Sequence, residues 1–194
     1  MRQLPEDRPS RTPASPVVRI SFVSSVTAFL IAFVGYALGI RINLSGSIPP
    51  GIYRIVNAPV TRGAVVLVCL PPQTSAFARS RGFVPPGSCA DGAAPIGKTI
   101  AALDGDTVDV GLTGVSVNGR RLPNSMPLRA DSRGRPLNSY PAGRYFVGAD
   151  DVWIVSSYSP ASFDSRYFGP LDIHAITAHV HPLLTANWSQ PVSR

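Results

Sequence analysis

The stretch from Ile20 to Ile40 contains no charged residue, and this run constrains the fold more than any other feature of the chain. An α-helix rises about 1.5 Å per residue, so a helix of this length reaches about 31 Å, the thickness of a bilayer's hydrocarbon core. The run is preceded by four arginines: Arg2, Arg8, Arg11 and Arg19. Positive residues before a span favour a cytoplasmic N-terminus. The pattern predicts one transmembrane helix over residues 20–40.

The flanks of this run leave two interpretations open. Residues 1–19 combine the four arginines with four prolines and predict a short, basic, cytoplasmic leader. A cleaved signal peptide has a shorter apolar centre followed by small residues, and Ala37-Leu38-Gly39 would serve as a cleavage site. The length of the run favours a retained anchor instead. In both interpretations residues 41–184 form a domain outside the cytoplasm, and residues 185–194 form a C-terminal tail.

Alternation of apolar and polar residues beyond the span favours strands over helices. Asn118-Gly119 is a strong hairpin signal. Residues 73–82 are the one helix expected beyond the span. Residues 123–143 are rich in Pro, Ser, Gly and Arg and are expected to form an exposed loop. The sequence predicts a mainly β, mostly antiparallel domain. The expected strands are 52–56, 64–69, 96–103, 107–110, 115–117, 120–122, 144–147, 152–156 and 173–180.

The two cysteines, Cys69 and Cys89, both fall in the exported part. Disulfides persist in oxidising compartments, so a bond between them is expected. The closed loop of about twenty residues would stabilise the fold by roughly 3 kcal/mol. Two cysteines at this separation, without a nearby histidine, do not make a zinc site, so no metal is expected.

Lys98 is the only lysine among the eighteen lysines and arginines, and it lies in the apolar segment 94–103. Arginine keeps its charge at any working pH, whereas an ammonium can lose its proton when it is desolvated. A neutral buried amine can act as general base for a serine nucleophile. The alternative is a lysine kept by chance, whose side chain extends from a strand to the surface.

Two serine-containing segments offer partners for such a base. Ser47 follows Ile40 within at most about 23 Å of extended chain, and the Pro-Pro-Gly sequence after it restricts local freedom. The same residues are also ordinary in a flexible juxtamembrane linker. The second segment, Ser162-Phe163-Asp164-Ser165-Arg166, can form an ion pair that stiffens a loop. In a functional interpretation, Ser162 or Asp164 orients the lysine amine.

Other classes of function have weaker support. The net charge of +7 is spread as single arginines without a basic helix, which argues against a nucleic-acid partner. His174, His179 and His181 are an alternative source of a base in a Ser-His-Asp triad, but no serine or aspartate motif accompanies them, so a surface role is favoured. No G-x-S-x-G, phosphate-binding loop or H-E-x-x-H motif occurs.

Three ordered segments resemble the motifs of type I signal peptidases. Ser45-Gly46-Ser47-Ile48-Pro49-Pro50 resembles their nucleophile segment, and Ile96-Gly97-Lys98, followed by Leu103-Asp104-Gly105-Asp106, resembles their lysine segment. Ser162-Phe163-Asp164-Ser165-Arg166-Tyr167-Phe168-Gly169 is similar to their closing motif. Together with the preceding span, the resemblance covers residues 20–183. A narrower resemblance is to the TraF-type peptidases of conjugative plasmids and type IV secretion systems. It rests on Ser-Ile-Pro-Pro-Gly-Ile-Tyr from position 47, the cysteine pair, and Ser-Phe-Asp-Ser-Arg-Tyr-Phe-Gly-Pro from position 162.

The resemblance implies roles for the matching residues. Ser47 would be the nucleophile and Lys98 the general base, and the Ser47 backbone N–H, with the Ser45 hydroxyl, would form the oxyanion hole. Ser162 would position the lysine.

The ion pair of the closing motif has a supporting role in the same comparison. Asp164 and Arg166 would hold their loop together, with a more direct catalytic part for Asp164 in the TraF branch. Two departures from the general family favour that branch. Gly148-Ala149-Asp150-Asp151 stands where Gly-Asp-Asn is usual, and Thr99 stands where a basic residue usually follows the lysine.

The resemblance implies a membrane-anchored serine endopeptidase with an all-β, signal-peptidase-like fold on a single transmembrane helix, and no metal or organic cofactor. Its partners would be the lipid bilayer and membrane-tethered precursors, such as a pilin, at the periplasmic face of the inner membrane. Water acting on the acyl-enzyme would give hydrolysis, and the pilin's own amine would give a cyclic product. A general signal peptidase and a non-catalytic envelope subunit of a secretion system stay open as alternatives.

Overall fold

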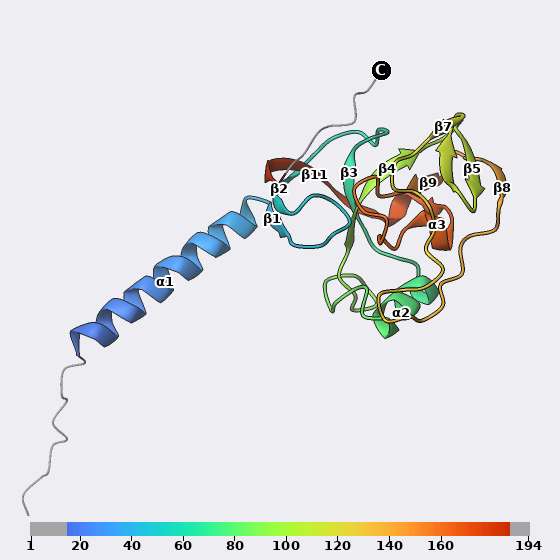
Figure 1. Cartoon of the computed structure of the whole chain (residues 1–194). Coiled ribbons are helices and arrows are strands. Elements are labelled where there is room, and N and C mark those ends of the chain that lie inside the picture. The colour runs from blue at the N-terminus through green and yellow to red at the C-terminus, as the bar shows by residue number, and fades with distance from the viewer. Residues whose placement is uncertain (1–14, 187–194) are drawn as a thin grey trace, which may run out of the picture. The chain divides into compact units, whose positions relative to one another are not determined.

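The computed structural model describes residues 15–186, so most of the expected leader and tail, residues 1–14 and 187–194, lies outside the described residues. The chain divides after Leu38 into two units. The first contains α1 (Pro16–Ala37), a helix without buried residues (Figure 1). Among the described residues it is the one helix that is long and apolar enough, by length and composition, to cross a membrane.

The helix is offset from the uncharged run on which its prediction was based. It begins before Ile20, because the Ser15 hydroxyl accepts a hydrogen bond from the first turn and Pro16 suits the first helical position. It ends before Ile40, because Gly39 has a φ of +80° just after the last turn, a conformation that favours glycine and terminates helices.

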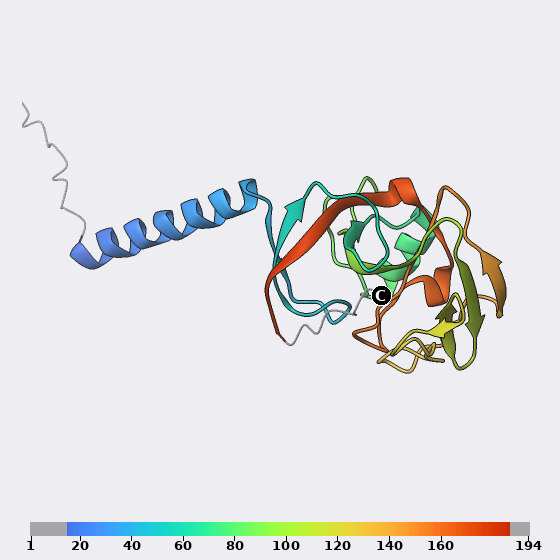
Figure 2. The same ribbon diagram turned by 90° about the horizontal axis from the view of Figure 1, so that it is seen from above.

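The second unit is mainly β, as the alternation predicts, and its larger sheet has seven strands in the order β1-β2-β11-β3-β4-β9-β10. Every neighbouring pair is antiparallel. β11, the long red strand in Figure 2, lies between β2 and β3. The strands are β1 (Ile40–Asn43), β2 (Gly51–Val56), β3 (Val65–Val68), β4 (Ile96–Ala102), β9 (Asp151–Ile154), β10 (Leu171–Asp172) and β11 (Ile176–Thr185).

A smaller antiparallel sheet has the order β7-β6-β5-β8. Its strands are β5 (Thr107–Gly111), β6 (Gly114–Val117), β7 (Arg120–Arg121) and β8 (Gly143–Phe146). The predicted turn joins β6 to β7, with φ values of +51° at Asn118 and +78° at Gly119. Two consecutive residues with positive φ define the hairpin turn that Asn-Gly favours.

β9 connects the two main hydrophobic clusters of this unit. Val152 and Ile154 lie in one cluster with Ile100. Trp153 and Val155 lie in the other, which β5 and β6 complete. Successive strand residues point to opposite faces, so a strand buried on both faces is continuously apolar. The buried strand gives a fixed starting point for the segment that follows it.

The helices of the second unit correct the predicted boundaries. The expected helix over 73–82 is present as α2 (Pro72–Ser80). A short α3 (Ser165–Phe168), which was not predicted, follows the Ser-Phe-Asp sequence. The predicted strand over 173–180 is wrong in its first turn, where η1 (Ile173–Ala175) is a 3-10 helix. Its cause is local, because the Asp172 carboxylate accepts the His174 N–H and caps that turn.

A disulfide joins Cys69 to Cys89 and closes the segment that contains α2. Inside this segment Phe77 and Phe83 pack against Phe163, with ring centroids 5.7 and 5.3 Å apart, respectively. Phe163 follows Ser162 directly, so the closed segment supports the closing motif through aromatic contacts.

We expect replacement of both cysteines by alanine to lower the free energy of unfolding by about 3 kcal/mol, because the open loop gains conformational entropy in the unfolded chain. Thermal unfolding of the oxidised protein and of the variant measures the difference. Reduction of the unmodified protein should produce the same loss and leave the variant unchanged. Equal stability of all four samples, or two free thiols in periplasmically folded protein by mass spectrometry, would contradict this expectation.

Candidate active site

Lys98 lies in the middle of β4 with 2% of its surface exposed. The residue before it makes room for a neighbouring loop, because a Cβ added at Gly97 would stand 2.9 Å from Ile48 Cδ1. Ile48 follows Ser47 in the loop between β1 and β2. The absence of a side chain at Gly97 therefore lets the loop that carries Ser47 lie directly against β4.

Three polar groups from distant parts of the chain meet at this point. Lys98 Nζ lies 2.5 Å from Ser47 Oγ and 2.7 Å from Ser162 Oγ. The two hydroxyl oxygens are 3.4 Å apart. The structure thus brings together a loop, a central strand and the segment between β9 and α3. These are the side chains to which the resemblance assigns the nucleophile, the base and its positioning group.

Burial lowers the pKa of the Lys98 amine from 10.5 to about 8. The negative charge of Asp164 opposes this shift, and the positive charge of Arg166 adds to it. Desolvation is the largest of the three effects, since it penalises only the charged form of the amine. About half of the amines are therefore neutral at pH 8, and the neutral form can accept a proton from a serine hydroxyl.

Asn43 holds the loop that carries Ser47. Its Nδ2 donates to the carbonyl oxygens of Ser45, Ile48 and Pro49 at 3.1–3.2 Å. Its Oδ1 accepts the Ser45 N–H and, at 2.7 Å, the Ser45 hydroxyl. The hydroxyl of Ser45 is thus directed toward Asn43. Within the described part of the chain the Ser47 N–H has no hydrogen-bond acceptor, so it is available to a substrate oxygen.

The far end of the same loop is fixed by Tyr53 on β2. Its hydroxyl donates to the Pro49 carbonyl at 2.6 Å, and its side chain packs with Ile48 in a small core. Burial, with a smaller effect of Tyr158, raises the pKa of Tyr53 to about 12, so this hydroxyl keeps its proton at any working pH. The loop is therefore held at both ends.

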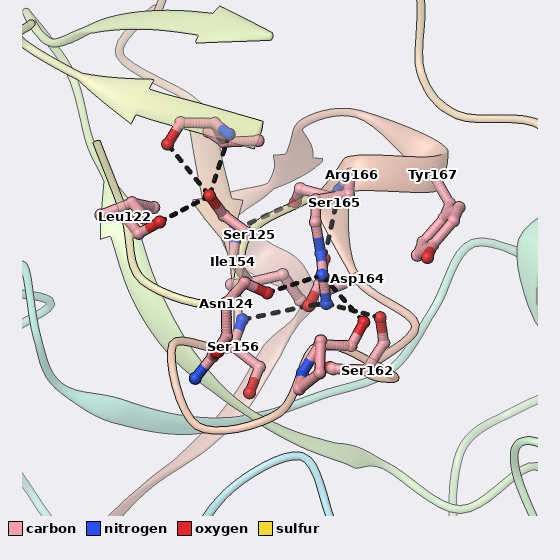
Figure 3. A network of polar contacts seen from close by, with 12 residues as sticks. Leu122, Asn124, Ser125, Ile154, Ser156, Ser162, Asp164, Ser165, Arg166 and Tyr167 are labelled. Carbon is pink, nitrogen blue, oxygen red and sulfur yellow. Dashed lines mark hydrogen bonds and ion pairs between the residues drawn. The ribbon is translucent and has the colours of Figure 1, made fainter. Parts of the chain in front are cut away.

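A buried ion pair lies beside the cluster of Lys98, Ser47 and Ser162. Asp164 and Arg166 form this pair, and neither residue is exposed (Figure 3). Arg166 Nε donates to Asp164 Oδ1 at 2.8 Å, and Nη2 donates to Oδ2 at 2.9 Å. Asp164 also caps α3 by accepting the Arg166 N–H. The two-point contact fixes the orientation of both side chains.

The remaining donors of Arg166 bind main-chain carbonyls of two loops. Five carbonyls accept from its guanidinium, those of Asn124, Met126, Ser159, Pro160 and Ser162. The shortest of these bonds, 2.7 Å, goes to the carbonyl of Ser162, whose hydroxyl contacts Lys98. Arg166 therefore determines where the Ser162 side chain can lie.

Asp164 sits one layer away from the amine in this arrangement. Both of its carboxylate oxygens bind Arg166, and Oδ2 also accepts the Ser156 N–H at 3.0 Å. In the described residues the hydrogen-bond partners of Lys98 Nζ are Ser47 and Ser162. Asp164 thus acts on the amine through its charge, and its hydrogen bonds serve the surrounding loops.

The sequence did not point to two groups of the site, Asn43 and Ser156. The Ser156 hydroxyl donates to the Ser47 carbonyl at 2.6 Å. The position of Ser156 directly after the apolar run 152–155 was the only signal in the sequence. This signal is weak, because a serine often follows an apolar strand. The expected exposed loop 123–143 is also partly structural, because it supplies the carbonyl of Asn124 to Arg166.

The histidines take no part in this cluster. His174 lies on η1, and His179 and His181 lie on β11. Within residues 15–186 the side-chain partners of the Ser47 hydroxyl are Lys98 and Ser162. Over the same residues no three His, Cys, Asp or Glu side chains gather as a metal site requires.

Comparison with known proteins identifies the family of this site. Residues 15–184 match the family of signal peptidases described as peptidase S26. The chain belongs to this family. The predicted resemblance to type I signal peptidases is therefore confirmed, and so is the signal-peptidase-like, mainly β fold.

The relatives extend over most of the chain. A plasmid transfer protein TraF from Escherichia coli is 42% identical over 84% of this chain and 92% of that protein. A conjugal transfer protein TraF from Agrobacterium tumefaciens is 38% identical over 84% and 90%, respectively. A crystal structure of a signal peptidase I from Enterococcus faecalis matches with 16% identity and a TM-score of 0.35, over 63% of this chain and 97% of that one. The identities of 42% and 38% with the two TraF proteins confirm the narrower resemblance.

The lowered pKa of Lys98 predicts a stability that rises with pH. Well below pH 8 the amine is protonated in both states, and the cost of burying its charge is fully present. Between about 8 and 10.5 the folded protein loses this proton first, so the cost is relieved and stability increases. Relative to Lys98→Met, the unmodified protein should gain about 2 kcal/mol of unfolding free energy between pH 7 and pH 10. Denaturant unfolding at both pH values measures this; parallel pH dependence in the two proteins would contradict it.

Proposed function

We propose that the chain is a serine endopeptidase in which Ser47 is the nucleophile and Lys98 the general base. The observation that carries the proposal is the 2.5 Å contact between Ser47 Oγ and a buried amine with a pKa of about 8. A serine hydroxyl becomes nucleophilic when a base takes its proton, and a partly neutral amine at this distance can do so. Membership of the signal peptidase family supports the same class of reaction.

In the proposed reaction, neutral Lys98 takes the proton of Ser47 while Oγ bonds to the scissile carbonyl carbon. The carbonyl oxygen becomes an oxyanion, which accepts a hydrogen bond from the Ser47 N–H. The C–N bond then breaks, and the Lys98 ammonium returns the proton to the leaving amine. An ester on Ser47 remains, and the Lys98 amine is neutral again. Lys98 then takes a proton from a water molecule, which attacks the ester and completes hydrolysis.

The surrounding groups act as supports in this proposal. Ser162 holds the amine at 2.7 Å and directs it toward Ser47. Asp164 and Arg166 fix the segment that carries Ser162. The Ser47 N–H donates the hydrogen bond that stabilises the oxyanion. The N–H and hydroxyl of Ser45 keep their hydrogen bonds to Asn43.

We infer that the substrate is a membrane-tethered precursor. A pilin precursor is the first candidate, because the relatives are named as plasmid and conjugal transfer proteins. If the bond cleaved lies near the C-terminus of a pilin, a C-terminal segment leaves as the amine and the pilin's own carbonyl stays on Ser47. Attack on this ester by the pilin's N-terminal amine would join its ends and release Ser47, whereas attack by water would give the linear product. The family description favours a general signal peptidase as the second candidate. Precursors of both kinds, offered to the purified protein, separate these candidates.

Cleavage of a pilin precursor should be abolished, by about 1,000-fold or more, in both Ser47→Ala and Lys98→Arg. The arginine variant keeps the charge but cannot lose it, so it tests the base directly. In the unmodified protein the rate should rise with pH and level off above a pKa of about 8, because the neutral amine is the active form. Mass spectrometry of the cleavage product measures the rates of both variants and the pH dependence of the unmodified protein.

His179→Ala is the matched control for the base, and it should cleave at the unmodified rate. Near-normal activity of folded Lys98→Arg would refute the dyad, and loss in His179→Ala alone would assign the base to β11. DNA transfer that survives Ser47→Ala in cells would favour a non-catalytic envelope subunit.

We further propose that α1 anchors the chain in the inner membrane with the second unit in the periplasm, since this helix has the length and composition of a span. Alkaline phosphatase fused after Arg194 should be active and stay in the membrane fraction after alkaline extraction. Replacing Val26 and Thr27, in the middle of α1, by arginine should abolish insertion, since each charge is costly at a helix centre. A soluble product starting near Ile40 would instead support a cleaved leader.

A further inference from the structure

The hydroxyl of Ser156 has all of its hydrogen-bonding capacity used in one arrangement. Ser156 is fully buried two residues after the end of β9. Its Oγ accepts the N–H groups of Tyr158 and Ser159, at 3.2 and 3.1 Å. A hydroxyl has two acceptor positions and one proton. With both acceptor positions occupied, the proton is directed to the remaining neighbour, the Ser47 carbonyl, at 2.6 Å.

The main chain of Ser156 is fixed as well. Its N–H donates to Asp164 Oδ2 at 3.0 Å, and the same carboxylate binds Arg166 (Figure 3). Val155 before it is buried and donates its N–H to Thr99 O on β4. Ser156 therefore extends from the rigid part of the sheet to the loop that carries the nucleophile.

The contact to Ser47 supplies something that the other loop contacts do not. Asn43 and Tyr53 bind the carbonyls on either side of Ser47 in the chain, at Ser45 and Pro49. Ser156 binds the carbonyl of Ser47 itself, which fixes the rotation of that residue about its Cα–C bond. A change in this rotation would move Oγ and the N–H relative to Lys98.

We propose that Ser156 is a positioning residue for the nucleophile, a role that rests on the proposed Ser47–Lys98 dyad. Asp164 then acts on both partners: its charge affects the lysine amine, and its hydrogen bond to Ser156 maintains the orientation of Ser47. The route runs from Asp164 Oδ2 through the N–H and Oγ of Ser156 to the Ser47 carbonyl.

This role predicts a specific kinetic pattern for Ser156→Ala. Loss of the hydroxyl lets Ser47 rotate away from its productive position, and a misplacement of about 1 Å can cost on the order of 100-fold in rate. We expect kcat to fall by about 10- to 100-fold with KM unchanged. The pH limb should stay at about 8, because burial and the neighbouring charges set the pKa of Lys98 and none of them is altered.

Ser159→Ala is the matched control, because it removes a hydroxyl from the same turn. Ser159 Oγ accepts the Ala161 N–H and has no contact to Ser47 among the described residues. The full-length variants in detergent are compared in kcat, KM and pH profile with a precursor peptide, after their thermal unfolding has been measured. A structural role alone would lower stability and leave kcat per folded molecule unchanged.

Each outcome decides the proposal. A fall in kcat for Ser156→Ala, with Ser159→Ala unaffected, supports it. Unchanged kcat, an equal loss in both variants, a rise in KM alone, or a shifted pH limb overturns it. If Ser156→Ala does not fold, Ser156→Thr and Ser156→Val are compared, since they differ in the hydroxyl alone: the threonine variant must be at least about 10-fold faster. Activity in Ser47→Ala would refute the dyad itself, whereas inactive Ser47→Ala beside fully active Ser156→Ala refutes only the positioning role.

Discussion

The arrangement of the site depends on one buried ion pair, because the loops around it are attached to Arg166. Neither Arg166 nor Asp164 is exposed, and an unpaired charge in such a place costs several kcal/mol. The carboxylate and five carbonyl acceptors offset that cost. The carbonyls belong to irregular segments, 124–126 and 159–162, which have no ladder of their own to hold them. The guanidinium gives these segments fixed positions, and Ser162 is fixed with them.

The same pair explains how a lysine can be neutral beside a carboxylate. Asp164 alone would stabilise the ammonium form of Lys98 and keep its pKa high. Arg166, bound to that carboxylate at two points, opposes this effect with a charge of the other sign. The two effects have opposite directions, so desolvation determines the outcome. An arginine at position 98 would keep its proton under the same conditions, which gives the single lysine of the chain a chemical reason.

The sequence predicted the chemical groups better than the contacts that orient them. Local signals, a lone lysine in an apolar segment and a serine before Pro-Pro-Gly, marked Lys98 and Ser47 but left bland alternatives open for both, and the resemblance of three ordered segments to signal peptidase motifs assigned them to one site. The mainly β class was predictable from alternation, which is also local. The insertion of β11 between β2 and β3 is not encoded in any short pattern. Ser156 was missed for the same reason, since its partner lies 109 residues earlier, and a hydrogen bond over that distance leaves no periodicity to detect.

The position of the nucleophile on a loop follows from the chemistry that we propose for it. In a strand of this sheet the Ser47 N–H would be used by a neighbouring strand, and no donor would remain for an oxyanion. The residue must therefore lie on irregular backbone, which has many conformations and costs entropy to fix. Side-chain hydrogen bonds from Asn43, Tyr53 and Ser156 replace the missing ladder. They leave the N–H of Ser47 free while they hold its neighbours, so the loop combines an open donor with a defined orientation toward Lys98.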